Sequence, residues 1–183
     1  MKEKSHKGDF DMIDRGALAK EYFLKGYNCS QAVLLAFSDM TGLDETVAMK
    51  MSSSFGGGMG RLREVCGTVS ASLMVLGILY GYDAKAPTAG EDKPAHYARV
   101  QEYANRFRTE CGSIICREIL QNHAKYLESQ KEITKNDEQI AAMRSNSSAP
   151  TPRTADYYQK RPCAEIAAKA ANILDQYIQE LNQ

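Results

Sequence analysis

The sequence has no tryptophan, only three histidines and no surplus of charge of either sign. Lys plus Arg equals Asp plus Glu at 23 each, so no basic stripe is available for a nucleic-acid backbone and no nucleic-acid partner is expected. The histidines are dispersed and form no H-E-x-x-H helix. This argues against a histidine-rich metal site at His6, His96 and His123.

Long apolar runs are also lacking. The longest uncharged apolar segment, residues 65–81, contains glycine, threonine and serine and is shorter than the roughly 20 residues that a bilayer-spanning helix needs. We therefore expect no membrane insertion and interpret the segment as a buried central helix. The charged residues 1–12 lack the apolar segment of a secretion signal, so the expected location is cytoplasmic.

No stretch alternates apolar and polar residues long enough to indicate a sheet, and apolar residues recur instead at helical spacing. The prediction is an all-α fold, a single-domain helical bundle of about six to eight helices over residues 1–183. A polar segment around residues 123–161 is expected to be less ordered. Helices are predicted over residues 9–25, 29–40, 44–53, 94–109, 114–122, 137–144 and 162–181, and from a start between 62 and 67 to residue 80.

Glycine is concentrated in the loop G-G-G-M-G at residues 56–60. The loop follows no predicted strand, lacks the further glycine of a dinucleotide fingerprint and lacks the Gly-Lys-Ser/Thr ending of a phosphate loop, so nucleotide binding is not expected. Arg61 and Arg63 follow it near a predicted helix start. They either hold a small anion there or are solvated or paired with an acid such as Glu64.

Cysteine occurs at five positions, an odd number spread over the chain. Structural disulfides are therefore not the default, and such cysteines are core residues, redox thiols or metal ligands. Cys111 lies at a helix end and is expected to be a bystander, or a resolving thiol if the Gly112 turn folds it back. The other four fall at or near helix starts, where unpaired N–H groups and a partial positive charge would lower the cysteine pKa: Cys29, Cys66, Cys116 and Cys163.

The segments around these four cysteines are similar to a known family. They are N-C-S-Q-A-V at 28–33, F-G-G-G-M-G at 55–60, C-G-T-V-S-A at 66–71, G-S-I-I-C-R-E-I-L at 112–120 and P-C at 162–163. Together they resemble the redox-active proteins named for a C, GCAxxG, C, C pattern, over most of the chain.

The resemblance implies an α-helical cytoplasmic protein with a thiol redox function and no known substrate. Its four characteristic cysteines map to the same four helix-start cysteines, which leaves Cys111 as the extra one. The sequence departs from the pattern at Thr68, where alanine is expected, and at Ala71, where glycine is expected. Both are small residues, so close helix packing is retained.

Three hypotheses remain open. The first is a thiol redox protein, in enzyme terms a thiol-disulfide oxidoreductase, in which Cys66 attacks and Cys29, Cys116 or Cys163 closes a reversible disulfide. It needs no bound cofactor and acts on an unidentified redox partner or small-molecule substrate. The second is a zinc or iron–sulfur site on the same four cysteines. The third is a helical binding module whose cysteines only pack.

The adjacent Tyr157-Tyr158 could also mark a homodimer contact.

Overall fold

The computed structural model describes residues 13–130 and 138–183, and within them it contains ten α-helices and no strand. The all-α prediction is confirmed, whereas the predicted count of about six to eight helices is too low. The helices are α1 (Arg15–Leu24), α2 (Cys29–Leu35), α3 (Ser38–Thr41), α4 (Glu45–Ser53), α5 (Gly67–Tyr80), α6 (Ala89–Cys111), α7 (Cys116–Ser129), α8 (Glu138–Arg144), α9 (Ala155–Lys160) and α10 (Cys163–Leu181).

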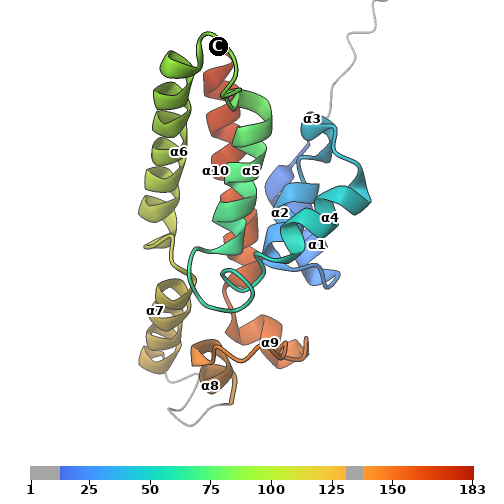
Figure 1. Ribbon diagram of the computed structural model, residues 1–183. Helices are drawn as coiled ribbons and strands as arrows, with labels where there is room; N and C mark the ends of the chain where they lie inside the picture. The colour runs from blue at the N-terminus through green and yellow to red at the C-terminus, as the bar shows by residue number, and fades with distance from the viewer. Residues whose placement is uncertain (1–12, 131–137) are drawn as a thin grey trace, which may run out of the picture.

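Three long helices, α5, α6 and α10, pack side by side and form the long axis of the molecule (Figure 1). Helices α1 and α2 pack on α10 and α5, and α4 covers α2. Helices α7, α8 and α9 lie beyond the end at which α5 and α10 begin. None of the helices in the described ranges combines the length and apolar character that a membrane crossing requires.

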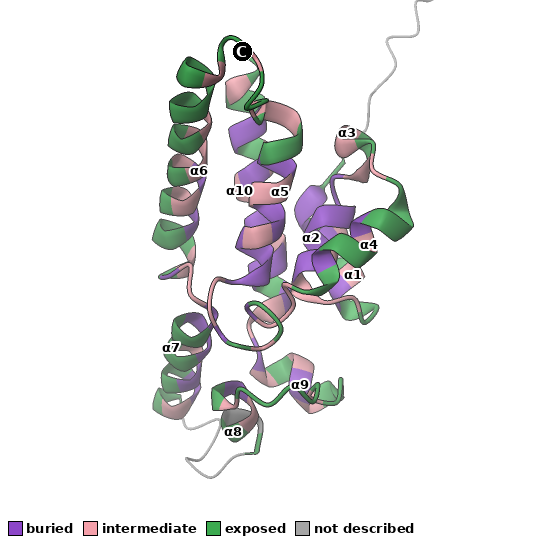
Figure 2. Ribbon diagram, viewed as in Figure 1, coloured by how far each residue is buried: buried purple, intermediate pink, exposed green. Residues whose placement is uncertain are grey.

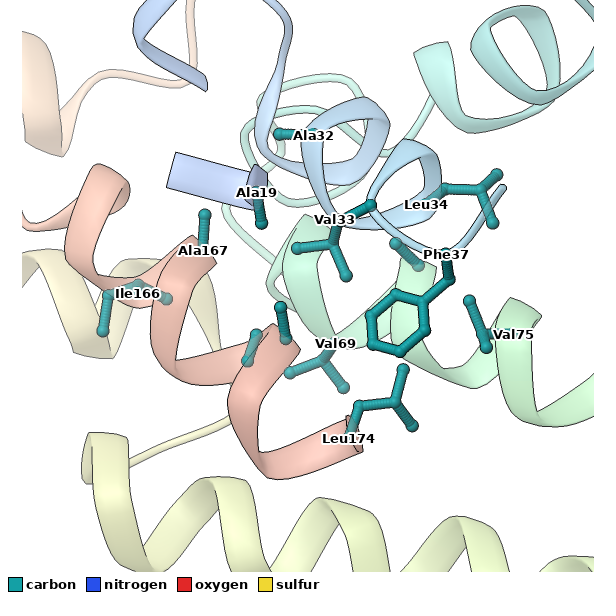
Figure 3. Close-up of a cluster of buried hydrophobic side chains, with 14 of the residues drawn as sticks. Ala19, Ala32, Val33, Leu34, Phe37, Val69, Val75, Ile166, Ala167 and Leu174 are labelled. Atoms are coloured by element: carbon teal, nitrogen blue, oxygen red, sulfur yellow. The ribbon is translucent and has the colours of Figure 1, made fainter. Parts of the chain in front are cut away.

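The main core lies where α1, α2, α5, α6 and α10 meet, and buried residues line the facing sides of these helices (Figure 2). The Phe37 ring lies among Val69, Val75 and Leu174 (Figure 3). Helix α10 contributes small side chains, with Ala167, Ala170 and Ala171 all fully buried. Small residues at these positions let the helices approach closely, so the core is densely packed. Space for a functional site is therefore left at the starts of the helices and not in the core.

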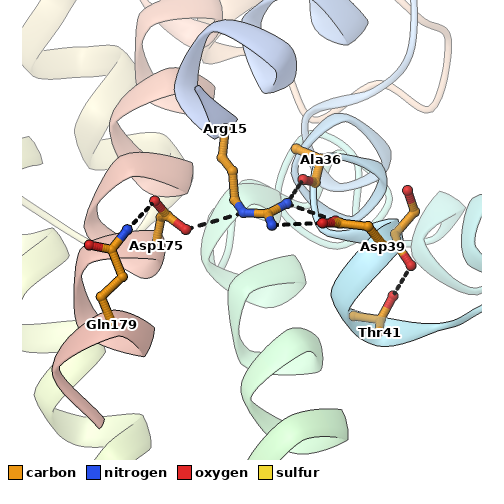
Figure 4. Close-up of polar contacts among 7 residues, drawn as sticks. Arg15, Ala36, Asp39, Thr41, Asp175 and Gln179 are labelled. Atoms are coloured by element: carbon orange, nitrogen blue, oxygen red, sulfur yellow. Dashed lines mark hydrogen bonds and ion pairs between the residues drawn. The ribbon is translucent and has the colours of Figure 1, made fainter. Parts of the chain in front are cut away.

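One predicted helix, over residues 29–40, is broken into α2 and α3 by a buried arginine (Figure 4). The Arg15 guanidinium donates to the carbonyl of Ala36 at 2.6 Å and pairs with two carboxylates. In an uninterrupted helix that carbonyl would accept the N–H of Met40. The Met40 N–H donates instead to the carbonyl of Phe37 at 3.1 Å. Arg15 therefore occupies the acceptor that the helix would need to continue.

Candidate functional site

The four predicted cysteines stand at the starts of four helices, as the sequence indicates. Cys29, Cys116 and Cys163 are the first residues of α2, α7 and α10, and Cys66 is the N-cap residue of α5. The start of α2 is fixed by a capping box, in which the Asn28 side chain accepts from two backbone N–H groups. Local capping therefore positions Cys29, whereas the starts of α5, α7 and α10 carry no side-chain cap hydrogen bond.

All four cysteines line one pocket of about 290 Å³. Cys66 and Cys116 are buried, at 7% and 8% exposed, while Cys29 and Cys163 are partly exposed. Every one of the six pairs among them is close enough for one thiol to shift the pKa of another. The structure thus gathers residues that are up to 134 positions apart in the chain, all of them as free thiols.

A short antiparallel backbone bridge between Val65 and Ile115 positions two of the cysteines. The Cys66 N–H donates to the carbonyl of Ile114 at 2.8 Å, and the Cys116 N–H donates to the carbonyl of Glu64 at 2.7 Å. The bridge fixes both cysteines in register on the pocket wall. The sequence does not predict it, because one residue pair is too short to leave an alternating pattern.

The glycine-rich loop forms a second wall and runs through the left-handed region of backbone conformation. All residues from Gly57 to Arg61 have φ between 58° and 74°, and Arg63 has φ 62°. Left-handed backbone costs a residue with a side chain roughly 1–2 kcal/mol, so Met59 and both arginines are strained. A Cβ added at Gly58 would lie 2.7 Å from the Cβ of Cys116, which shows how closely the loop approaches this cysteine.

The two strained arginines tie this loop to the segment after α8. Arg61 Nε donates to the carbonyl of Ser147 at 2.6 Å. Arg63, only 3% exposed, donates to the carbonyls of Ser145 and Ala142 at 3.1 and 3.3 Å. The bonds from Arg63 cap the C-terminal end of α8, and both arginines line the pocket.

Of the alternatives open for these arginines, an ion pair with Glu64 is not formed. The Glu64 carboxylate is occupied by Arg117, with both oxygens 2.8 Å from guanidinium nitrogens. Both side chains of this ion pair are exposed, and neither residue lines the pocket. Arg61 and Arg63 therefore keep their charge within the pocket lining.

The expected lowering of the cysteine pKa is wrong for three of the four. Burial raises the pKa of Cys116 and of Cys163 to about 12, and it raises the pKa of Cys66 as well. Arg63 beside Cys116 and Arg161 beside Cys163 act in the opposite direction without cancelling the effect of burial. With pKa values raised in this way, these three side chains are neutral thiols at pH 7.

The departure from the family pattern at Thr68 acts directly on one thiol. Thr68 is fully buried, and its hydroxyl lies 3.2 Å from the Sγ of Cys66. This contact opposes the rise in the pKa of Cys66 that burial causes. A residue that the sequence marks only as a small replacement for alanine thus supplies a polar partner for a pocket cysteine.

Three pocket residues were missed by sequence reasoning. Tyr157 is 7% exposed, and its ring lies 4.9 Å from the Arg153 guanidinium and 4.8 Å from that of Arg161. Burial raises the pKa of Tyr157 to about 12. Tyr157 lines the cysteine pocket, and the homodimer contact suggested for Tyr157-Tyr158 stays a prediction. The only sequence signal was the position of Arg161, two residues before Cys163.

Cys111 is placed apart from the other cysteines. It does not line their pocket but an adjoining surface depression, beside Glu110 and Lys169, which shares Arg161 with the pocket. Burial raises the pKa of Cys111 to about 11, and the charges that act on it come from those two neighbours. Cys111 is therefore suited to serve as an internal control for experiments on the pocket.

Within residues 13–130 and 138–183, no group of three or more Cys, His, Asp or Glu side chains is arranged to hold a metal ion. A family model described as "Putative redox-active protein (C_GCAxxG_C_C)" matches residues 27–177. No curated protein and no solved structure matches the chain. The matched range includes all four pocket cysteines and both walls of the pocket.

Proposed function

The chain belongs to the C_GCAxxG_C_C family of redox-active proteins, and from that premise we propose that it is a thiol–disulfide oxidoreductase. In this proposal the pocket cysteines form a reversible disulfide at the expense of a disulfide substrate. The observation that carries the proposal is the convergence of four free thiols from four helices on one pocket.

Cys29 is the best candidate for the attacking thiol. It is partly exposed, and its Sγ lies against the first residue of α5, where a Cβ added at Gly67 would be only 2.7 Å away. The partial positive charge of a helix start stabilises negative charge on a sulfur as it attacks. The burial of Cys66 and its raised pKa disfavour the attacking role that the sequence predicts for it.

Cys66 is better suited to resolve the mixed disulfide. Of the neighbouring thiols, Cys29 has the largest effect on the pKa of Cys66, and it also has the largest effect on the pKa of Cys163. A resolving thiol needs no access to bulk solvent, because its target is another protein sulfur. Since all four thiols are free in this structure, closing the disulfide requires a local movement of the pocket walls.

The proposed reaction has two exchange steps. Cys29 loses a proton to solvent, and its thiolate attacks one sulfur of a small disulfide R–S–S–R′, so that the S–S bond breaks and R′–S⁻ leaves and is protonated. Cys66, deprotonated in turn, attacks Sγ of Cys29 and releases R–S⁻, which is also protonated. Two protein thiols are oxidised to one disulfide, and the substrate is reduced to two thiols.

The experiment is oxidation with hydroxyethyl disulfide, followed by acid quenching, alkylation of the remaining thiols and mapping of the peptides by mass spectrometry. The expected product is one intramolecular disulfide that contains Cys29. The Cys29→Ser variant should lose this product, whereas the matched Cys111→Ser variant should keep it. Unchanged oxidation of the Cys29→Ser variant would contradict the assignment of Cys29, and the absence of any disulfide among the four would contradict the function.

A further inference from the structure

The lining of the cysteine pocket is strongly positive. Among the described residues that line it there is no aspartate, glutamate, lysine or histidine. Over the whole chain, by contrast, acidic and basic residues are equal in number. The charged residues of the lining are Arg61, Arg63, Arg153 and Arg161.

These four charges are not neutralised within the described part of the chain, because none of the four arginines forms an ion pair with a carboxylate there. Arg61 and Arg63 donate to backbone carbonyls. Arg153, at the exposed mouth, contacts the carbonyls of Phe23 and Tyr27 and stacks 4.4 Å above the Phe23 ring. Neutral partners of this kind orient a guanidinium but leave its charge available to a ligand.

Arg161 is the most exceptional of the four. It is only 5% exposed, and its Nε is buried without a hydrogen-bond partner among the described residues. Its only hydrogen bond there is a long one of 3.5 Å, from Nη2 to the hydroxyl of Thr151. A buried charged donor without a partner is costly, and such a group calls for an explanation by function. Burial also lowers the pKa of Arg161, as expected for a charge held away from water.

We propose that the pocket selects small disulfides that carry carboxylate groups, with Arg161 and Arg63 binding a carboxylate in the interior and Arg153 attracting the substrate at the mouth. The inference rests on the proposed thiol–disulfide exchange and names its substrate class. A carboxylate accepts two parallel hydrogen bonds from one guanidinium, which matches the vacant donors of Arg161. The starts of α5, α7 and α10 at the same pocket add a weaker field of the same sign.

Charge selectivity is tested with three aliphatic disulfides: dithiodipropionate, a dianion; cystamine, a dication; and hydroxyethyl disulfide, which is neutral. The measured quantity is the rate constant for oxidation of the pocket thiols by each. At low ionic strength the dianion should react about tenfold faster than the dication, and added salt should reduce this ratio. Ordinary exposed thiolates show the opposite order, because the anionic sulfur attracts the cation.

The arginine variants locate the effect. Arg161→Gln and Arg63→Gln should each lower the ratio of the two rate constants about fivefold. Arg161→Lys keeps the positive charge but loses the planar guanidinium with its two parallel donors. Its ratio of the two rate constants should therefore lie between those of Arg161→Gln and the wild type. The matched control, Arg108→Gln, removes an exposed arginine that does not line the pocket and should leave the ratio unchanged.

Binding without reaction separates the inference from the proposed function. Octanedioate has the length and charge of dithiodipropionate but no sulfur, and hexanediamine is the corresponding analogue of cystamine. Calorimetry on the wild-type protein should detect one octanedioate per chain and no binding of hexanediamine. Octanedioate binding without any disulfide formation would uphold the anion site and overturn the redox function. Equal rates for all three disulfides, with no octanedioate binding, would overturn the anion site and leave the redox function standing.

Discussion

Two buried arginines of this protein have opposite surroundings. Arg15 is 7% exposed and donates to Asp39, to Asp175 and to the carbonyl of Ala36 (Figure 4). Arg161 is 5% exposed, yet it contacts no carboxylate in the described chain and its Nε has no partner there. The Arg15 cluster joins α1, the chain after α2, and α10, and is complete by itself. In our proposal, a substrate carboxylate is the partner that Arg161 lacks among the described residues.

The largest expected contrast is in stability. Arg15→Met should reduce the free energy of unfolding by about 2–4 kcal/mol, because it leaves the buried carbonyl of Ala36 without its donor and breaks two ion pairs to partly exposed carboxylates. Arg161→Gln should change it by less than about 1 kcal/mol, because no ion pair is lost. Urea unfolding of both variants checks the comparison. A large loss of stability in Arg161→Gln would show that Arg161 is a structural residue like Arg15.

The backbone of the pocket provides the next largest effect. Gly58→Ala combines a positive φ of 74° with a Cβ placed 2.7 Å from that of Cys116. Gly60→Ala is the matched control, since its φ is 61° but its nearest neighbour is 3.8 Å away. We expect Gly60→Ala to cost roughly 1–2 kcal/mol for the backbone alone, and Gly58→Ala to cost about 2 kcal/mol more.

Thermal unfolding measures this difference. Equal losses in the two glycine variants would mean that the loop does not pack against Cys116 as the structure has it.

The two regions should also lose stability at opposite ends of the pH scale. Arg15 lowers the pKa of Asp39, so the stability this pair contributes is present above the ordinary carboxyl pKa near 4 and is lost as the pH falls below it. Burial raises the pKa of Cys116 and Cys163 to about 12. The unfolded chain releases these protons near pH 8.5 while the folded chain holds them, so stability falls as the pH rises from about 8.5 toward 12.

Unfolding by urea between pH 3 and pH 11 checks both limbs of this profile. Cys116→Ala should make the alkaline loss shallower without changing the acid limb, and Arg15→Met should do the reverse. An alkaline limb that is unchanged in Cys116→Ala would contradict the burial of that thiol.

The smallest expected effect concerns Thr68. Thr68→Ala restores the residue of the family pattern and removes the hydroxyl 3.2 Å from the Sγ of Cys66. The free energy of unfolding should fall by about 1 kcal/mol. The pKa of Cys66 should rise further, so that alkylation of Cys66 at pH 9 becomes slower. Thr68→Ser, which keeps the hydroxyl, is the control and should alkylate at the wild-type rate.

The features that the sequence predicts correctly depend on local signals. Helical periodicity indicates the all-α class, and capping by Asn28 or a proline before Cys163 marks where a helix begins. The four cysteines could therefore be assigned to helix starts without knowledge of the packing. The four helices begin around the same pocket, so four cysteines that the sequence places separately at helix starts lie together in the fold.

The features that were missed depend on contacts between distant residues. The break after α2 depends on Arg15 reaching the carbonyl of Ala36, and the bridge between Val65 and Ile115 joins residues 50 positions apart. The sign of the cysteine pKa shift was wrong because burial outweighs the field of a helix start. Arg153 reaches the pocket through a loop whose composition carries no signal of it.

The most direct test of the redox account is the state of all five cysteines after equilibration of the wild-type protein with dithiodipropionate, before and after addition of a dithiol. The account predicts one disulfide between Cys29 and another pocket cysteine, complete return to free thiols with the dithiol, and Cys111 free throughout. Oxidation confined to Cys111, or five cysteines that all stay free, would contradict it.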